Sequence, residues 1–80
     1  MTISSAVAKR IKELLVQNNI TQYKLEQNSC LSHETVKSIM KGKTKGVNLK
    51  TLVYIADGFG ITVSEFLDSE LFLYDNLDLD

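Results

Sequence analysis

Polar and basic side chains that can contact a nucleic acid are concentrated between residues 22 and 45. Lysine forms ion pairs with phosphates, whereas amide, hydroxyl, imidazole and carboxylate groups form hydrogen bonds with phosphate oxygens or base edges. The candidate residues are Gln22, His33, Glu34, Lys37, Ser38, Lys41, Lys43 and Lys45. This set favours nucleic-acid binding. The Gln22 amide suits a phosphate oxygen, and an ordinary solvent-facing side chain is the alternative. The Glu34 carboxylate can accept from the amino group of a cytosine, or it can complement the dipole of its helix without DNA.

The same stretch holds the three residues on which an enzyme or a metal site would depend: Cys30, His33 and Glu34. Cys-x-x-His supplies only two zinc ligands, and the sequence has no second pair to complete a tetrahedral site. His-Glu-Thr-Val-Lys lacks the second histidine of a metalloprotease helix, and a Cys–His nucleophile would need a cleft that so small a domain hardly offers. We therefore expect no catalysis, no metal and no cofactor.

Two short helices joined by a turn, over residues 21–43, are expected to position the candidate side chains. Thr21 and Ser32 each precede a run with helical spacing, and each can accept from the free N–H groups of a first helical turn. Residues 28–31 are too few for a crossover, so the two helices must pack at a steep angle. In the second helix the spacing predicts a buried face of Val36, Ile39 and Met40, opposite an outward set of His33, Glu34, Lys37, Ser38 and Lys41.

A longer helix is predicted before this pair, from Ser4 or Ser5 to Asn18. It ends where asparagine tolerates the left-handed conformation, at Asn18–Asn19. Gly42 is expected to end the second helix of the pair in the same way. These two predicted helices thus each have a residue type that can stop them.

Two more helices are predicted after the pair. Asn48 suits the N-cap of a fourth helix. This helix is strongly apolar, with Leu49, Leu52, Val53, Ile55 and Ala56, so we expect it to be the central buried helix of the domain rather than a surface element. Thr62–Glu65 fits a capping box that begins a short helix at residues 63–67, after Gly60 ends the fourth. The fold predicted is all-α, a compact bundle of five helices. Its expected core is Val7, Ile11, Leu14, Leu25, Val36, Ile39, Leu52, Ile55, Phe59 and Phe66.

Charge is distributed unevenly along the 80 residues, although the net charge is only −1. Residues 1–56 hold all nine basic residues and three acids, a net +6, whereas residues 57–80 hold seven acids and no base, a net −7. Such asymmetry favours an anionic partner for the basic part, and solvated surface charge is the alternative. Five lysines between residues 37 and 50 favour phosphate.

The length fits one small domain at residues 1–68, followed by an acidic tail at residues 69–80. Leu71 to Tyr74 are four bulky apolar residues that are costly to expose. They dock on the domain or on a second copy, or else they belong to a partly ordered, solubilising end.

The composition also indicates the cellular compartment in which the protein is expected. A single cysteine excludes an intrachain disulfide, no apolar run is long enough to span a membrane, and residues 1–15 do not have the order of a signal peptide. We therefore expect a cytoplasmic protein associated with the nucleoid.

An ordered set of residues carries a family resemblance over about residues 7–67. The set comprises Thr21-Gln22, Leu25, Ser32, Val36, Ile39, Gly42-Lys43-Thr44, Leu49, Thr51-Leu52, Ile55-Ala56, Gly60-Ile61 and Ser64-Glu65-Phe66-Leu67. No single element is specific, but the order and spacing together resemble the Cro/C1-type helix-turn-helix family, or XRE family, of bacterial and phage transcription regulators. The fold that this implies is the lambda-repressor-like DNA-binding domain.

The resemblance implies a transcription regulator, most often a repressor, that inserts the helix beginning at Ser32 into the major groove. Gln22 then takes the phosphate-bracing position. His33, Glu34 and Ser38 fall where such proteins present side chains to base edges, with Lys37 and Lys41 beside them. Lys43 and Lys45 follow in the loop, where family members reach the DNA backbone at the position of Lys43.

Two residues depart from the family pattern. Glu26 stands where a small residue is usual, and we expect its side chain to tilt outward. Cys30 stands where the turn usually has glycine, so either Cys30 adopts a strained positive φ or the turn differs in detail.

The expected partner is double-stranded DNA. One recognition helix covers few base pairs, so we expect a homodimer, formed through the fifth helix and the tail, on a pseudo-palindromic operator. The alternative is a protein-interaction module, antitoxin-like or a regulator's partner, that keeps the fold with little DNA binding of its own.

Overall fold

The computed structural model describes residues 1–79 and contains five α-helices and two short 3₁₀ turns. The helices are α1 (Ile3–Gln17), α2 (Gln22–Asn28), α3 (His33–Met40), α4 (Leu49–Gly58) and α5 (Val63–Leu67), and the turns are η1 (Glu70–Phe72) and η2 (Tyr74–Asn76). Within the described chain there is no strand, and the β-type pairing is a single bridge between Thr2 and Asp78. The predicted all-α, five-helix architecture is confirmed.

Every α-helix begins at a side chain that accepts a hydrogen bond from the backbone N–H three residues ahead. The N-caps are Thr2, Thr21, Ser32, Asn48 and Thr62. Four of them were predicted, whereas the first helix begins at Ile3 and not at Ser4 or Ser5 as expected. Thr2, rather than Ser4 or Ser5, caps α1, because Ser4 is buried at 2% exposure inside the helix.

Left-handed residues end three of the helices where the sequence predicted them. Asn19, Gly42 and Gly60 have φ of 53°, 66° and 74°, respectively. A sharp reversal after each helix therefore needs no strained residue, since asparagine and glycine tolerate this conformation.

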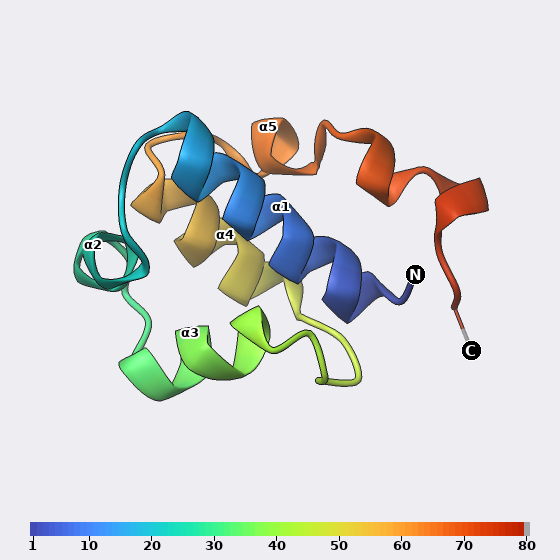
Figure 1. The fold of residues 1–80 in the computed structure, drawn as a ribbon, viewed down its shortest axis with the longest axis horizontal. Helices are drawn as coiled ribbons and strands as arrows, with labels where there is room; N and C mark the ends of the chain where they lie inside the picture. The colour runs from blue at the N-terminus through green and yellow to red at the C-terminus, as the bar shows by residue number, and fades with distance from the viewer. Residues whose placement is uncertain (80) are drawn as a thin grey trace.

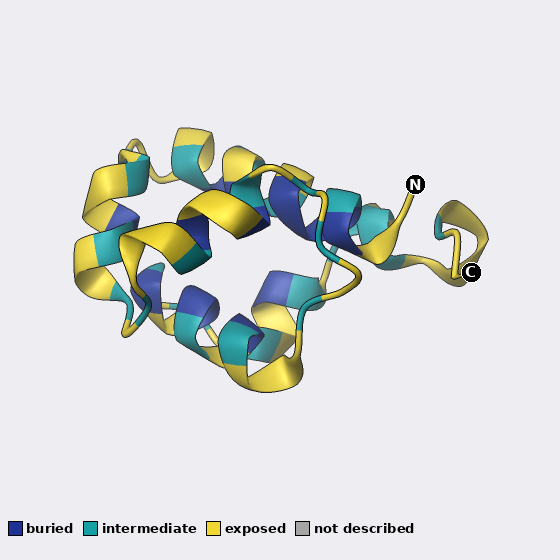
Figure 2. Cartoon of the chain, turned by 90° about the horizontal axis from the view of Figure 1, so that it is seen from below, coloured by how far each residue is buried: buried dark blue, intermediate teal, exposed yellow. Residues whose placement is uncertain are grey.

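The helices pack around one core, with α1 against α3, α2 against both α3 and α4, and α4 against α5 (Figure 1). The most deeply buried large side chains are Phe66, Ile11, Leu25, Ile55, Val7 and Val36. Phe59, expected in the core, is only half-buried and packs against its edge. In Figure 2 buried and exposed residues alternate along each helix, so every helix presents one face to the core.

α4 differs from the prediction of a central buried helix, because one of its faces is exposed. Leu49 is 64% exposed and Val53 is 45% exposed, whereas Leu52, Ile55 and Ala56 are buried. Only one face of the helix packs on the core, because a domain of this size has no second layer of helices to cover the other face.

The predicted tail docks on the domain. Phe72 of η1 packs against the core, with its ring centroid 6.1 Å from that of Phe66, whereas Leu73 and Tyr74 are 57% and 77% exposed. The chain then returns to its own start, where the Asp78 N–H donates to the Met1 carbonyl at 2.8 Å (Figure 1). Asp80, the last residue of the predicted tail, lies outside the described residues.

Candidate nucleic-acid interface

α3 is fixed to the core along one side and open to solvent along the other. Val36 and Ile39 are buried at 1% and 5% exposure, and Met40 packs against the core as a half-buried side chain. The five outward residues predicted from the spacing, all exposed, are His33, Glu34, Lys37, Ser38 and Lys41. The helix therefore presents a polar, largely basic face that is held firmly from behind.

The turn before α3 contains no strained cysteine. Among residues 1–79, Asn19 is the one non-glycine with positive φ, so Cys30 does not take the conformation of the glycine usual there. Ser29 instead leaves α2 in an extended conformation, with φ −96° and ψ 167°. Of the two alternatives for this position, a turn that differs in detail is the one observed.

The side chain of Glu26, a residue of α2, lies between α2 and α3 and joins two of the predicted site residues. Gln22 Nε2 donates to Glu26 Oε2 at 3.1 Å, and His33 Nδ1 lies 2.9 Å from both carboxylate oxygens. The Glu26 side chain is only 11% exposed, against 60% for that of His33. The expectation that Glu26 tilts outward is wrong, because two hydrogen-bond donors draw it toward the helix pair.

The electrostatics of Glu26 agree with this geometry. The hydrogen bond from His33 lowers the pKa of the Glu26 carboxyl below its usual value, burial opposes this, and the hydrogen bond from Gln22 adds to the lowering. Glu26 is thus an anion that holds the first residue of α2 and the first residue of α3 together.

The loop after α3 is anchored at its middle to the start of α1. The buried Ser4 hydroxyl donates to the Thr44 carbonyl and lies 2.9 Å from the Thr44 hydroxyl, which in turn donates to the Gly46 carbonyl at 3.1 Å. Gly42 lies against the same part of α1, where a Cβ built on it would be 3.5 Å from the Ser5 Cα. The lysines of this segment project from a backbone that α1 holds in place.

These lysines are exposed and have no acidic partner within the described chain. Lys37, Lys41, Lys43 and Lys45 are all exposed. Among residues 1–79 the charged groups in contact are Met1 with Asp78, and Glu26 with His33, whose ring is a cation only when it is protonated. The positive charge beside α3 is therefore available to an anionic ligand.

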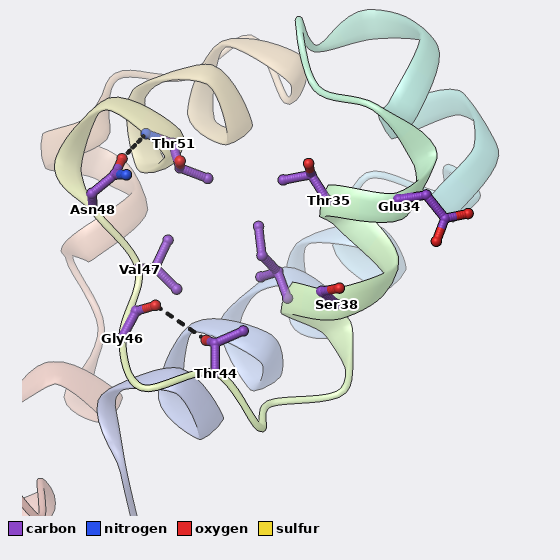
Figure 3. Close-up of a pocket in the computed structure, with 9 residues that line it drawn as sticks. Glu34, Thr35, Ser38, Thr44, Gly46, Val47, Asn48 and Thr51 are labelled. Carbon is purple, nitrogen blue, oxygen red and sulfur yellow. Dashed lines mark hydrogen bonds between the residues drawn. The ribbon is translucent and has the colours of Figure 1, made fainter.

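A pocket of about 340 Å³ lies beside α3, between that helix, the loop and the start of α4 (Figure 3). Thr35 points into it from α3 and Thr51 lines it from α4, where the Asn48 side chain accepts from the Thr51 N–H at 2.8 Å. Glu34 lies at its margin and points away (Figure 3). The pocket is polar at its rim and continuous with the exposed face of α3.

Comparison with known families decides what this arrangement is. A sequence-family model described as the Cro/C1-type HTH DNA-binding domain matches residues 10–70. The chain belongs to this family. No curated protein and no solved structure gives a match. The chain therefore carries a DNA-binding domain of the helix-turn-helix type, and α2 and α3 are two short helices joined by a turn within it.

One basic residue of the Cro/C1-type domain serves the fold rather than the interface. Arg10 of α1 donates from Nε to the Phe66 carbonyl at 2.7 Å and from a terminal nitrogen to the Glu65 carbonyl at 3.0 Å. A guanidinium there donates to carbonyls at the end of α5 and complements the dipole of that helix. The +6 counted from the sequence includes this charge, which lies away from α3.

Sequence reasoning missed Glu26 as a member of the candidate site. The usable signal was the spacing of four residues from Gln22, which places the two side chains on one face of a helix. Within the part of the chain that the structure describes, no three His, Cys, Asp or Glu residues form a group that could hold a metal ion. No described helix is long and apolar enough to cross a membrane.

Proposed function

We propose that this chain is a sequence-specific regulator, acting as a repressor, that places α3 in the major groove of double-stranded DNA. The observation that carries the proposal is the exposed polar face of α3. Hydrogen bonds of Glu26 to Gln22 and His33 hold the start of this helix, and the hydrogen bond from Ser4 to Thr44 holds the loop that follows it. A B-DNA major groove of about 12 Å width admits one α-helix. The role is non-catalytic and belongs to the cytoplasm and nucleoid of a bacterium or to a phage-infected cell.

The proposed contacts fall into two groups. Phosphates are bound by Gln22 at the start of α2 and by the lysines at the end of the recognition helix and beyond it. These lysines are Lys41, Lys43 and Lys45. Base edges are contacted by His33, Glu34, Lys37 and Ser38, which occupy the first two turns of α3. Phosphate contacts give affinity and orientation, whereas base contacts give specificity.

Glu34 has a distinct proposed role. Its carboxylate is exposed at the second position of α3 and forms no ion pair within residues 1–79. It accepts from a cytosine amino group at the cognate site, and phosphate repels it elsewhere. Glu34 therefore discriminates against other sequences as much as it favours one.

We further propose a homodimer on a pseudo-palindromic operator whose half-sites lie about 10 base pairs apart. Phe66 and Phe72 are taken up by the chain's own core, so helix five and most of the tail form part of the domain. The exposed apolar side chains of the tail that are left for pairing are Leu73, Tyr74 and Leu79. Residues 69–80 act as an acidic extension that directs phosphate toward the basic face.

Selection of bound sequences from a random duplex pool tests the proposal. We expect one enriched motif, repeated in inverted orientation about one helical turn apart. A recovered pool with the same sequence distribution as the input would overturn sequence-specific binding. It would favour the alternative, a protein-interaction module, antitoxin-like or a regulator's partner, that keeps this fold.

A further inference from the structure

The hydrogen bond between His33 and Glu26 fixes which ring nitrogen of His33 carries a hydrogen. An ionised carboxylate only accepts, and both Glu26 oxygens lie 2.9 Å from Nδ1, so Nδ1 must be the donor. In the neutral ring the remaining nitrogen, Nε2, then has a lone pair and no hydrogen. Nε2 becomes a donor only when the ring takes up a second proton and becomes an imidazolium.

DNA presents hydrogen-bond acceptors to the place that His33 occupies. His33 is the first residue of α3, and recognition helices meet DNA with their N-terminal residues. Gln22, held by the same carboxylate, is the first residue of α2. The shared chemistry of the DNA groups in question is that of an acceptor, either a phosphate oxygen or the O6 and N7 of guanine.

We propose that this chain takes up a proton at His33 when it binds DNA, and that Glu26 is the positioning residue that imposes this requirement. The imidazolium donates from Nδ1 to Glu26 and from Nε2 to the DNA acceptor. The inference rests on the proposed function, because it concerns the same interface.

The charged surroundings of His33 are few. On α3, Glu34 follows it and Lys37 lies one turn along. On α2, Lys24 and Tyr23 are exposed, and Cys30 lies exposed in the turn. The charged residues of α1 face elsewhere: Arg10 bonds to α5, and Lys9, Lys12 and Glu13 line pockets at the tail and along α1 itself. Glu26 is the one described carboxylate hydrogen-bonded to the ring, and His33 is the only histidine in the sequence.

The direction of the pH dependence follows from proton uptake. The complex holds one more proton than the free protein and DNA, so raising the pH weakens binding. Affinity is flat where the free ring is already charged and falls by up to about tenfold per pH unit where it is neutral. Neutral Nε2 accepting from a cytosine or adenine amino group would give the opposite slope.

The test measures affinity for a selected duplex between about pH 5.5 and 8 at constant ionic strength, with calorimetry in two buffers of different ionisation enthalpy to count protons. His33→Gln, whose amide donates at every pH, is expected to bind without the slope. Glu26→Gln is also expected to lose the slope, because its amide can donate to Nδ1 and leave a hydrogen on Nε2 of the neutral ring. Glu13→Gln removes one carboxylate far from α3 and is expected to keep the slope.

Two further measurements keep the outcomes separate. Long-range ¹H–¹⁵N spectra of the free full-length protein at pH 8 should show the hydrogen on Nδ1, and this holds whether or not the Glu26 variant folds. Duplexes with single substitutions identify the acceptor. If it is a phosphate, one methylphosphonate removes the dependence of affinity on pH; if it is guanine N7, one 7-deazaguanine removes it.

The proposal is overturned if wild type and His33→Gln have the same pH dependence, if wild-type affinity rises with pH, or if the hydrogen resides on Nε2. A protein that shows no preference among duplexes at any pH contradicts the proposed function instead.

Discussion

At the scale of single residues, the exposed face of α3 and the loop after it combine side chains that should respond differently to substitution. Lys43 follows the left-handed Gly42 in a loop anchored by Thr44, where a phosphate contact carries no sequence information. Glu34 lies on the face proposed to meet base edges. The two residues therefore separate affinity from specificity.

We predict that Lys43→Ala weakens binding to the selected duplex and to random DNA equally and lowers the salt slope by about one unit. Glu34→Ala should instead change preference at one base position by roughly 1 to 3 kcal/mol. Titrations over a range of salt with duplexes altered one base at a time measure both effects. Lys12→Ala on α1 is the control for loss of a surface charge, and a common effect of the Lys43 and Glu34 changes would refute the division.

The sequence predicted which residues of α3 are exposed, because a helical period of 3.6 determines that from local spacing. It did not predict the partners of Glu26 or Arg10. His33 lies seven residues after Glu26 and across a turn, and Phe66 lies 56 residues after Arg10, so both contacts depend on how the helices pack. A long polar side chain can form hydrogen bonds either with water or with a distant group of the protein, and the local sequence pattern does not distinguish the two.

At the scale of elements, helix starts and stops were the best predicted features. Thr21, Ser32, Asn48 and Thr62 were identified as N-caps because capping depends on a hydrogen bond within three residues. Gly58 is the last residue of α4, where a glycine ordinarily weakens a helix. The structure gives it a packing role, since a Cβ placed there would lie 2.8 Å from Leu25 Cδ1 and 3.2 Å from Ser29 Cβ.

Gly58→Ala should therefore destabilise the protein, although alanine favours helices more than glycine does. Overpacking against the fully buried Leu25 is expected to lower the free energy of unfolding by about 1 to 3 kcal/mol. Urea denaturation measures the change. Gly46→Ala is the matched control, because a Cβ there meets nothing within 4 Å, and a loss at Gly46 as large as at Gly58 would contradict the packing argument.

The capping box of α5 predicts a dependence of stability on pH. The Thr62 N–H donates to Glu65 Oε1 at 3.0 Å, and the Thr62 hydroxyl accepts from the Glu65 N–H. The hydrogen bond from the Thr62 backbone, followed by that of its side chain, lowers the pKa of Glu65 from its ordinary value of 4.5. A carboxyl with a lowered pKa in the folded state stabilises the protein above its unfolded pKa, and this contribution is lost as pH falls through the folded value.

Wild type should accordingly unfold at a higher temperature than Glu65→Gln at pH 7, and the gap should close as the pH falls below about 4.5. Thermal unfolding followed by circular dichroism gives both midpoints. Asp68→Asn, which removes one negative charge from the other end of α5, is the control for the loss of charge alone. A gap for Glu65→Gln that persists unchanged at the lowest pH would exclude the carboxylate as its source.

At the scale of the whole molecule, residues 69–79 of the acidic tail pack on the five helices. Its docking was one of three alternatives from the sequence, because residues 69–79 keep no helical period and make their contacts with α1 and the N-terminus. Phe72 joins the core, and Leu73 and Tyr74 remain exposed. The 3₁₀ turns η1 and η2, which carry Glu70 and Asp75, thereby lie at the end of the molecule away from α2 (Figure 1).

Sedimentation of the full chain with and without the selected duplex tests the homodimer. We expect two chains per duplex, and one chain per duplex for Tyr74→Ala if that side chain lies at the contact. Val16→Ala, at a residue 81% exposed on α1, is the control for loss of a surface apolar group. Strictly one wild-type chain per duplex would refute the dimer and leave the DNA-binding proposal intact.

The central claim is that α3 reads a DNA sequence, and the ratio of two dissociation constants tests it most directly. Wild-type protein is titrated, at about 0.15 M salt, with the selected duplex and with a scrambled duplex of the same length and composition. Specific recognition predicts that the selected duplex binds about 10³-fold more tightly or better. A ratio near one, with the same salt slope for both duplexes, would contradict it.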